Sequence, residues 1–217
     1  MQINIKAILF LTALCSNSYI MPYTIMIDPA GDSQHIGRVI DNTFERGITL
    51  QCAESLKTAL AKELPQIRVV ISRIPGESVE KLQNAAFANR LQVDLYLNLQ
   101  FYQETNNPAK IAFYYYSYQP LTDAWHTPKP LSFYNLQEIY LLNYNLTKKL
   151  CLDFLHIWEQ EYKKYFVPLG AFGIPFQPFI GIQAPAIAIE AGLIHKDSWQ
   201  MLINPLVQII AKAIHEQ

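Results

Sequence analysis

Apolar strand-like segments that alternate with segments of helical periodicity constrain the fold of this chain more than any other feature. Strands are predicted at residues 24–28, 68–73, 93–99, 110–118 and 186–190. Helices are predicted over residues 48–64, 78–91, 136–164 and from 204 onward. Strands that alternate with helices imply a mainly parallel sheet that is covered on both faces. We therefore predict a fold of the α/β class.

The first predicted strand stops abruptly at Asp28-Pro29. Proline has no backbone N–H and restricts the residue before it to extended geometry, so the strand ends there. In open α/β sheets, ligands bind beyond the carboxyl ends of the strands. Glu190 stands at the carboxyl end of the last predicted strand. We therefore predict that the carboxyl groups of Asp28 and Glu190 meet at one rim of the sheet.

Three segments show no clean period and are predicted to be irregular. They are the polar loop 32–42, the proline-containing loop 119–134, and the segment 167–183, which is rich in Gly, Pro and Phe. Asn204 and Pro205 are typical of the cap and the first residue of a helix, so the closing helix is predicted to begin there.

The composition is that of one folded domain. The chain has 217 residues, of which 51% are hydrophobic and 16% are charged. This length suits a single domain with a sizeable core, and the high apolar content argues against disorder. The formal net charge is −1. Nucleic acid is therefore excluded as the main partner, because phosphate binding needs a basic face.

The N-terminus has the layout of a leader. Lys6 precedes the apolar run 7–15, which is too short to span a bilayer, and small polar residues follow. We predict a signal peptide at residues 1–18 and a single domain at 19–217. An N-terminal strand or core helix is the alternative. The leader implies export to the periplasm or cell envelope, with no stable membrane insertion after cleavage.

Removal of the leader leaves two cysteines, Cys52 and Cys151. Both lie within apolar periodic patterns, so buried free thiols are expected, and one disulfide is the alternative in an exported protein. The chain has no Cys-x-x-Cys, which argues against a thiolate zinc site and a redox motif.

Several short segments occur in an order that resembles one protein family. They are Asp28-Pro29, Phe44-Glu45 before a helix, Arg73, Ala88-Asn89, Val93-Asp94, the run Ala184 to Gly192, and Asn204-Pro205. Their order and spacing resemble the zinc-dependent N-acetylmuramoyl-L-alanine amidases of bacterial cell walls, over nearly all of the chain after the leader. The resemblance implies a three-layer α/β/α domain whose mixed, mainly parallel sheet has about six strands.

The resemblance also implies a site that is degenerate. In the family, two His and one Glu hold zinc, and a further Glu acts on the attacking water. In this chain the two His positions fall on Gly31 and Gln100, the Glu ligand matches Glu45, and the catalytic Glu matches Glu190. A catalytic zinc site needs about three protein ligands, and an amide oxygen is a poor one. The domain is therefore expected to lack a cofactor and to be catalytically impaired, because bound zinc is what lowers the pKa of the attacking water.

Two alternatives keep catalysis. In the first, His35, Glu45 and His195 together hold zinc and Glu190 acts as general base, so that the chain cleaves the bond between N-acetylmuramic acid and L-alanine. In the second, a metal-free hydrolase uses Glu45 and Glu190 as an acid and base pair. Against the first stands the simpler interpretation that His35 and His195 are solvated loop histidines.

Three further residues are candidates for substrate binding. Asp28 either orients a ligand or stabilises its turn. Arg73 either binds a carboxylate of a wall peptide or pairs with a nearby acid. Gln100 stands at the end of its strand, at a position where the family has a zinc ligand. The aromatic side chains of the strand 110–118 either stack on sugar rings or fill the core. The expected partner is peptidoglycan or a cell-wall protein, and the expected role is peptidoglycan binding or regulation of cell-wall hydrolysis.

Overall fold

The computed structural model describes residues 22–80, 82–118 and 134–215. The predicted leader and nearly all of the predicted loop 119–134 lie outside these residues. Within the described part of the chain, no helix is long and apolar enough to cross a membrane.

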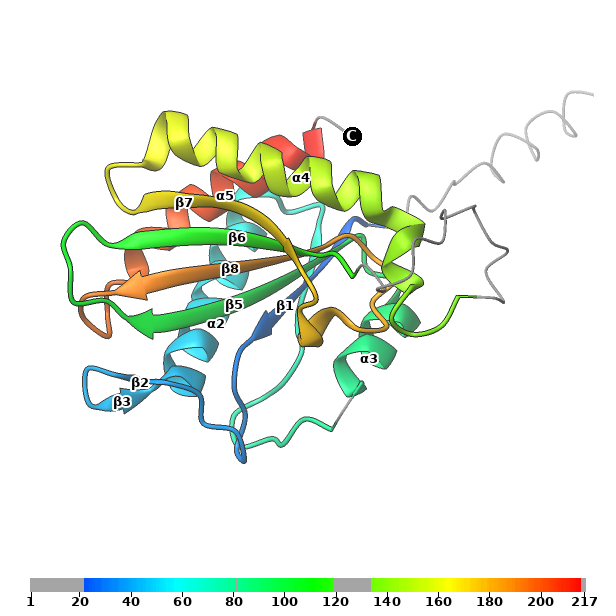
Figure 1. Ribbon diagram of the computed structural model, residues 1–217, viewed down its shortest axis with the longest axis horizontal. Helices are drawn as coiled ribbons and strands as arrows, with labels where there is room; N and C mark the ends of the chain where they lie inside the picture. The colour runs from blue at the N-terminus through cyan, green and yellow to red at the C-terminus, as the bar shows by residue number, and fades with distance from the viewer. Residues whose placement is uncertain (1–21, 81, 119–133, 216–217) are drawn as a thin grey trace, which may run out of the picture.

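A mixed sheet of six strands forms the middle layer (Figure 1). In order across the sheet, the strands are β4 (Arg68–Ile71), β1 (Thr24–Pro29), β5 (Leu95–Gln103), β8 (Ala186–Leu193), β6 (Lys110–Tyr116) and β7 (Val167–Ile174). The first four strands run parallel to one another. Strand β6 is antiparallel to β8, and β7 is parallel to β6. The predicted mixed, mainly parallel sheet is confirmed.

Helices cover both faces of this sheet, which confirms the three-layer α/β/α architecture. One face carries α2 (Glu45–Glu63), α4 (Tyr144–Ile157) and α5 (Gln200–His215). The other face carries α3 (Gln83–Leu91) and the short 3₁₀ helix η4 (Gln177–Phe179). Figure 1 shows α3 apart from the three longer helices.

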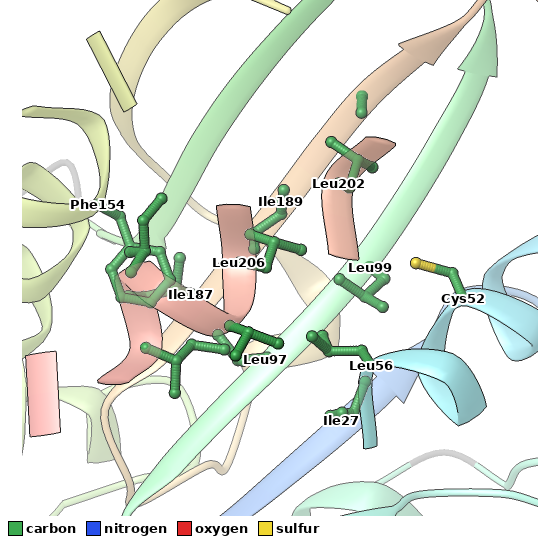
Figure 2. Packing of buried hydrophobic residues seen from close by; sticks show 14 of the residues in the cluster. Ile27, Cys52, Leu56, Leu97, Leu99, Phe154, Ile187, Ile189, Leu202 and Leu206 are labelled. Atoms are coloured by element: carbon green, nitrogen blue, oxygen red, sulfur yellow. The ribbon is translucent and has the colours of Figure 1, made fainter. Parts of the chain in front are cut away.

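The main core lies between the sheet and the three long helices. Side chains alternate between the faces of a strand, so every second residue points into this core. Figure 2 shows Leu97 and Leu99 of β5 beside Ile187 and Ile189 of β8, packed against side chains of α2 and α5. Burial of such a side chain contributes about 1.5–3 kcal/mol. Cys52 and Cys151 are free thiols buried in the same core.

The opposite face of the strands positions the site. Near the amino ends of the parallel strands this face is apolar, and Met26 and Tyr96 pack there against Phe179 of η4. Toward the carboxyl ends the same face presents polar side chains, because Asp28 follows Met26 by two residues and Asn98 follows Tyr96 by two. The same face of β1 and β5 is therefore apolar at Met26 and Tyr96 and polar two residues later, at Asp28 and Asn98.

Two predicted irregular segments contain strands. The segment 167–183 holds β7, an edge strand with Pro168 and a bulge at Gly170, where the register with β6 shifts. Proline and glycine are tolerated at edges and bulges, so their presence hid the strand. The loop 32–42 enters a hairpin of β2 (Val39–Ile40) and β3 (Thr43–Phe44). The two residues between these strands, Asp41 and Asn42, have φ values of 47° and 63°, as the tight hairpin turn requires.

Three predicted helix boundaries are wrong. The helix predicted over residues 78–91 begins at Gln83, after Leu82 in the left-handed conformation. The closing helix begins at Gln200, and Pro205 lies inside it. The buried stripe of α5 already starts at Leu202, so burial of the helix outweighs the hydrogen bond that the proline removes. The predicted helix 136–164 is divided into a 3₁₀ turn (Ile139–Asn143), α4, and a π-helical turn (Trp158–Tyr162).

Candidate functional site

Polar side chains gather at the carboxyl ends of β1, β5 and β8, on the face that carries α3. Asp28 of β1 pairs in register with Asn98 of β5, and Gln100 of β5 pairs with Glu190 of β8. The strand order thus brings Asp28 and Glu190 to the same rim, with β5 between them.

Asp28 is buried at the centre of a hydrogen-bond network. Its Oδ1 accepts from Ser72 Oγ at 2.6 Å and from Asn84 Nδ2 at 2.8 Å, and its Oδ2 accepts from Asn98 Nδ2 at 2.8 Å. Burial raises the pKa of Asp28 above its usual range, although the hydrogen bonds from Ser72 and Asn98 act to lower it. The carboxyl group therefore ties the end of β1 to α3, to β5 and to the segment after β4.

Glu45, the first residue of α2, is also buried, and both of its carboxylate oxygens accept hydrogen bonds from backbone N–H groups. Oε1 accepts from the N–H of Phe101 at 2.8 Å, and Oε2 accepts from the N–H of Arg38 at 3.0 Å. The side chain connects the start of α2 to the end of β5 and to the hairpin loop.

Glu190 is held on both sides by donors. Arg38 Nη1 donates to its Oε1 at 2.7 Å, and Tyr114 Oη donates to its Oε2 at 2.9 Å. Arg38 Nη1 also lies 3.3 Å from the carbonyl oxygen of Phe101, and its guanidinium lies 5.9 Å from the ring centroid of Tyr102. Partial burial and the neighbouring Glu190 raise the pKa of Tyr114 to about 12, so this hydroxyl remains a donor at neutral pH.

Arg73 is buried and binds main-chain carbonyls. Its Nε donates to Pro29 O at 3.2 Å, and its Nη2 donates to Ala30 O at 3.3 Å and to Arg46 O at 2.8 Å. The guanidinium fixes the turn after β1. The hydrogen bonds of Arg73 go to the backbone. Burial lowers the pKa of Arg73, and the nearby carboxylates of Asp28 and Asp32 act against this shift.

Asp32 organises the loop that contains His35. Its carboxylate accepts from the backbone N–H groups of Gln34 at 2.8 Å, His35 at 2.6 Å and Val79 at 3.2 Å. Burial acts to raise the pKa of Asp32, but these hydrogen bonds outweigh it and lower the pKa to about 2. The exposed ring of His35 lies with Nδ1 3.2 Å from the same carboxylate.

The lowered pKa of Asp32 predicts a specific loss of stability in acid. A carboxyl group whose pKa is lower in the folded state contributes stability above its unfolded pKa of 3.8, and this contribution disappears as the pH falls toward about 2. Between pH 4 and pH 2, the thermal midpoint of Asp32→Asn should therefore fall less than that of the unmodified chain. Circular dichroism melts at steps of half a pH unit measure this, and parallel curves would contradict it.

The residues at the implied zinc positions do not fit the ion. Gly31 has a φ of +78°, and a Cβ there would lie 2.8 Å from Arg46 Cβ and 2.9 Å from His35 O. Gln100 offers only an amide, and both oxygens of Glu45 already accept backbone hydrogen bonds. The positive guanidinium of Arg38 lies against Glu190 and the carbonyl oxygen of Phe101.

The alternative ligand set is not assembled either. His35 lies against Asp32, and the exposed His195 follows β8, where its backbone N–H donates to Ser198 Oγ at 3.1 Å. Across residues 22–80, 82–118 and 134–215, no group of three His, Cys, Asp or Glu side chains is placed to hold a metal ion. No catalytic step through a metal follows from these residues.

A cleft opens beside this network, at the carboxyl ends of β1 and β5 and below α3 and η4. Its volume is about 380 Å³. Its polar lining includes Asp28, Asn84, Asn98, Gln100 and Gln177, and Arg73 and His35 also line it. The cleft thus contains all three predicted substrate-binding residues, Asp28, Arg73 and Gln100. Sequence reasoning missed Arg38, which lies in a loop without periodicity, and it assigned no role to Asn84, Asn98 or Gln177.

Comparison with known proteins supports the fold. No protein-family model matches this sequence, and no curated protein matches it. Solved structures do match. An N-acetylmuramoyl-L-alanine amidase from Clostridium difficile 630 is 20% identical, with a TM-score of 0.67 over 90% of this chain and 98% of that chain.

Two further solved structures have the same fold as this chain. The catalytic domain of the amidase CwlV from Bacillus (Paenibacillus) polymyxa var. colistinus is 14% identical, with a TM-score of 0.63 over 89% of this chain and 99% of that chain. The amidase CwlD from Clostridioides difficile, solved in complex with the GerS lipoprotein, is 11% identical, with a TM-score of 0.64 over 90% of this chain and 100% of that chain. At these identities the likeness establishes the fold, and this chain has the fold of N-acetylmuramoyl-L-alanine amidases.

Proposed function

We propose that this chain is an amidase-fold domain that binds peptidoglycan in the cell envelope without hydrolysing it. The shared fold supports the ligand class. The observation that carries the proposal is the state of Glu190, whose two carboxylate oxygens are occupied by Arg38 and Tyr114. A domain bound to the wall would also compete with the hydrolases that cleave the wall. Such competition is the regulatory role that we propose.

The environment of Glu190 is unfavourable for a general base. A general base must accept a proton from water, and both carboxylate oxygens of Glu190 already accept hydrogen bonds, one from Arg38 and one from Tyr114. Gly31 and Gln100 supply no ligand set for a metal that would activate the water. An acid and base pair of Glu45 and Glu190 is not favoured either, because Glu45 holds two backbone amides.

The same arrangement favours binding. Arg38 is about half exposed at 48%, so its guanidinium can contact solvent and Glu190 together. Guanidinium groups form strong, directional hydrogen bonds with carboxylates, and the peptides of the cell wall carry carboxylates. Phe172 is exposed on the edge strand, where it packs against Tyr114 with ring centroids 5.8 Å apart. Aromatic faces of this kind suit sugar rings.

Loss of the Arg38 guanidinium should weaken binding to the wall. A hydrogen bond to a charged group contributes about 1.5–3 kcal/mol, so Arg38→Ala should lower the affinity for purified sacculi by about tenfold or more. Co-sedimentation of the protein with sacculi over a range of concentrations measures this.

Arg68→Ala is the matched control, because Arg68 is exposed at the opposite end of the sheet, at the start of β4. Its affinity for sacculi should equal that of the unmodified chain. Failure of the unmodified chain to sediment with sacculi would overturn the proposal, and equal affinities for the two arginine variants would remove Arg38 from the binding surface.

A further inference from the structure

A second groove lies between α3 and the end of the edge strand β4. Its volume is about 540 Å³, which is within the range of ligand pockets. Helix α3 separates this groove from the cleft, because Asn84 and Ala85 line the cleft whereas Ala86 and Phe87 line the groove. Among the described residues, Arg73 alone lines both. The groove is therefore a separate place on the molecule, at the outer edge of the sheet.

The strand wall of the groove is an open sheet edge. Among the described strands, β4 pairs with β1 alone. The backbone N–H groups of Arg68 and Ser72 donate to carbonyl oxygens on the side of β1, at 2.8 Å and 2.9 Å. Successive residues of a strand direct their N–H and C=O groups to opposite sides, so those of Val69 and Ile71 point away from β1. The edge therefore offers backbone donors and acceptors to one further strand.

The helix wall of the groove is a single stripe of α3. Gln83, Ala86, Phe87 and Arg90 line it, and their spacing of three and four residues places them on one face of the helix. Ile74, which follows β4, adds apolar surface and is 69% exposed. A strand added to the edge of β4 would direct every second side chain toward this stripe.

The two ends of the groove carry opposite charges. Helix α3 leads into β5, so Arg90 in its last turn lies toward the amino ends of the strands. The guanidinium of Arg90 stacks on Phe87, 5.6 Å from the ring centroid, and across residues 22–80, 82–118 and 134–215 it forms no ion pair or hydrogen bond. Glu77 lies at the other end, in the turn after β4, where it accepts from Gln83 Nε2 at 3.3 Å. A ligand that carries an anion at one end is therefore oriented by the groove.

We propose that this groove binds the C-terminal segment of a partner protein as a seventh strand, antiparallel to β4. The terminal carboxylate of the segment pairs with Arg90, because a guanidinium that is stacked on a ring and has no acceptor is well placed to bind a carboxylate. The direction follows from this contact, since Arg90 lies toward the amino end of β4. The backbone of the segment pairs with Val69 and Ile71, and its apolar side chains pack on Phe87.

The short groove suits the end of a chain. Strand β4 has four residues and α3 has nine, so only a few residues of a partner can be held between them. The groove also shares no residue with the wall-binding surface of Arg38 and Phe172. A partner protein can therefore dock on this edge while the domain is bound to the wall.

Nuclear magnetic resonance of the backbone amides tests the added strand. The probes are four hexapeptides of the sequence Lys-Val-Thr-Val-Thr followed by Val, Ile, Leu or Phe, each with a free carboxylate. They alternate apolar and polar side chains, and their lysine falls near Glu77. We expect at least one of them to shift the signals of Val69 and Ile71 in a saturable manner, while the signal of Ile189 in the middle of the sheet stays in place. No saturable shift at Val69 and Ile71 with any of the four at millimolar concentration would overturn the proposal.

A double-mutant cycle tests the contact with the carboxylate. Arg90→Ala should weaken the binding of the tightest hexapeptide at least fivefold, and so should conversion of the peptide carboxylate to an amide. The two changes together should weaken binding no more than either one alone, because both remove the same ion pair. Lys148→Ala, an exposed site on α4, should leave the affinity unchanged. Fully additive losses would contradict the pairing of the carboxylate with Arg90.

A large side chain at position 86 tests where the peptide lies. Ala86 is exposed on α3, so Ala86→Trp fills the groove without disturbing the core. This variant should keep the circular dichroism spectrum of the unmodified chain and lose at least tenfold in affinity for the hexapeptide. Unchanged affinity would show that the peptide does not occupy the groove, and the proposal would fail.

Discussion

Replacement of Asp28 by alanine should lower the free energy of unfolding by about 3 kcal/mol or more. The carboxyl group accepts hydrogen bonds from Ser72, Asn84 and Asn98, and it is only 5% exposed. Its removal takes the acceptor from Ser72 and Asn84 and one of two acceptors from Asn98, whose Nδ2 also donates to the carbonyl oxygen of residue 28. Each buried group left unsatisfied costs about 1–3 kcal/mol. Urea unfolding followed by tryptophan fluorescence measures the change.

Asp153→Ala is the control for this prediction. Asp153 lies on α4 and forms a surface ion pair with Lys149 at 2.8 Å. Surface pairs of this kind contribute about 0–1 kcal/mol, so this variant should stay close to the unmodified chain. Equal losses in the two variants would show that Asp28 does not organise the rim of the sheet.

Any side chain at position 31 should destabilise the protein, even the smallest. Gly31 has a φ of +78°, a conformation that costs a residue with a Cβ about 1–2 kcal/mol. A Cβ would also lie 2.8 Å from Arg46 Cβ, and such overpacking adds about 1–3 kcal/mol. Gly31→Ala should therefore lower the free energy of unfolding by about 2–5 kcal/mol.

Gly76→Ala separates these two effects. Gly76 has a φ of +80°, but a Cβ there would have no neighbour within 4 Å. The free energy of unfolding of Gly76→Ala should fall only by the cost of the left-handed conformation, about 1–2 kcal/mol. Urea unfolding of both variants gives the comparison. Equal losses would mean that the space around Gly31 adjusts, and that a histidine could be introduced there by a single substitution.

The fold was largely predictable, because it depends on patterns that are local in the sequence. The runs Ala186 to Ile189 of β8 and Ile25 to Ile27 of β1 are continuously apolar, which is typical of central strands covered on both faces. Strand β7 was missed because it lies at the sheet edge, where Pro168 and Gly170 are tolerated. The start of α5 was misplaced because Pro205 is usual at the beginning of a helix but lies inside this one.

The site was less predictable, because its contacts join distant parts of the chain. Asp28 and Glu190 were found from their positions at strand ends. Arg38 reaches Glu190 across 152 residues, and no periodicity or motif marks an arginine in a hairpin loop. Arg73 was noticed for its charge, but its partners are backbone carbonyls, which a sequence pattern does not reveal.

The central claim is that the domain binds the cell wall and leaves it intact. Its most direct test is to incubate the protein with purified sacculi in the presence of added zinc and to analyse the soluble fraction by mass spectrometry. We expect the protein to sediment with the sacculi and the soluble fraction to contain no wall peptides beyond the buffer control. Release of wall peptides that stops in the Glu190→Gln variant would contradict this account.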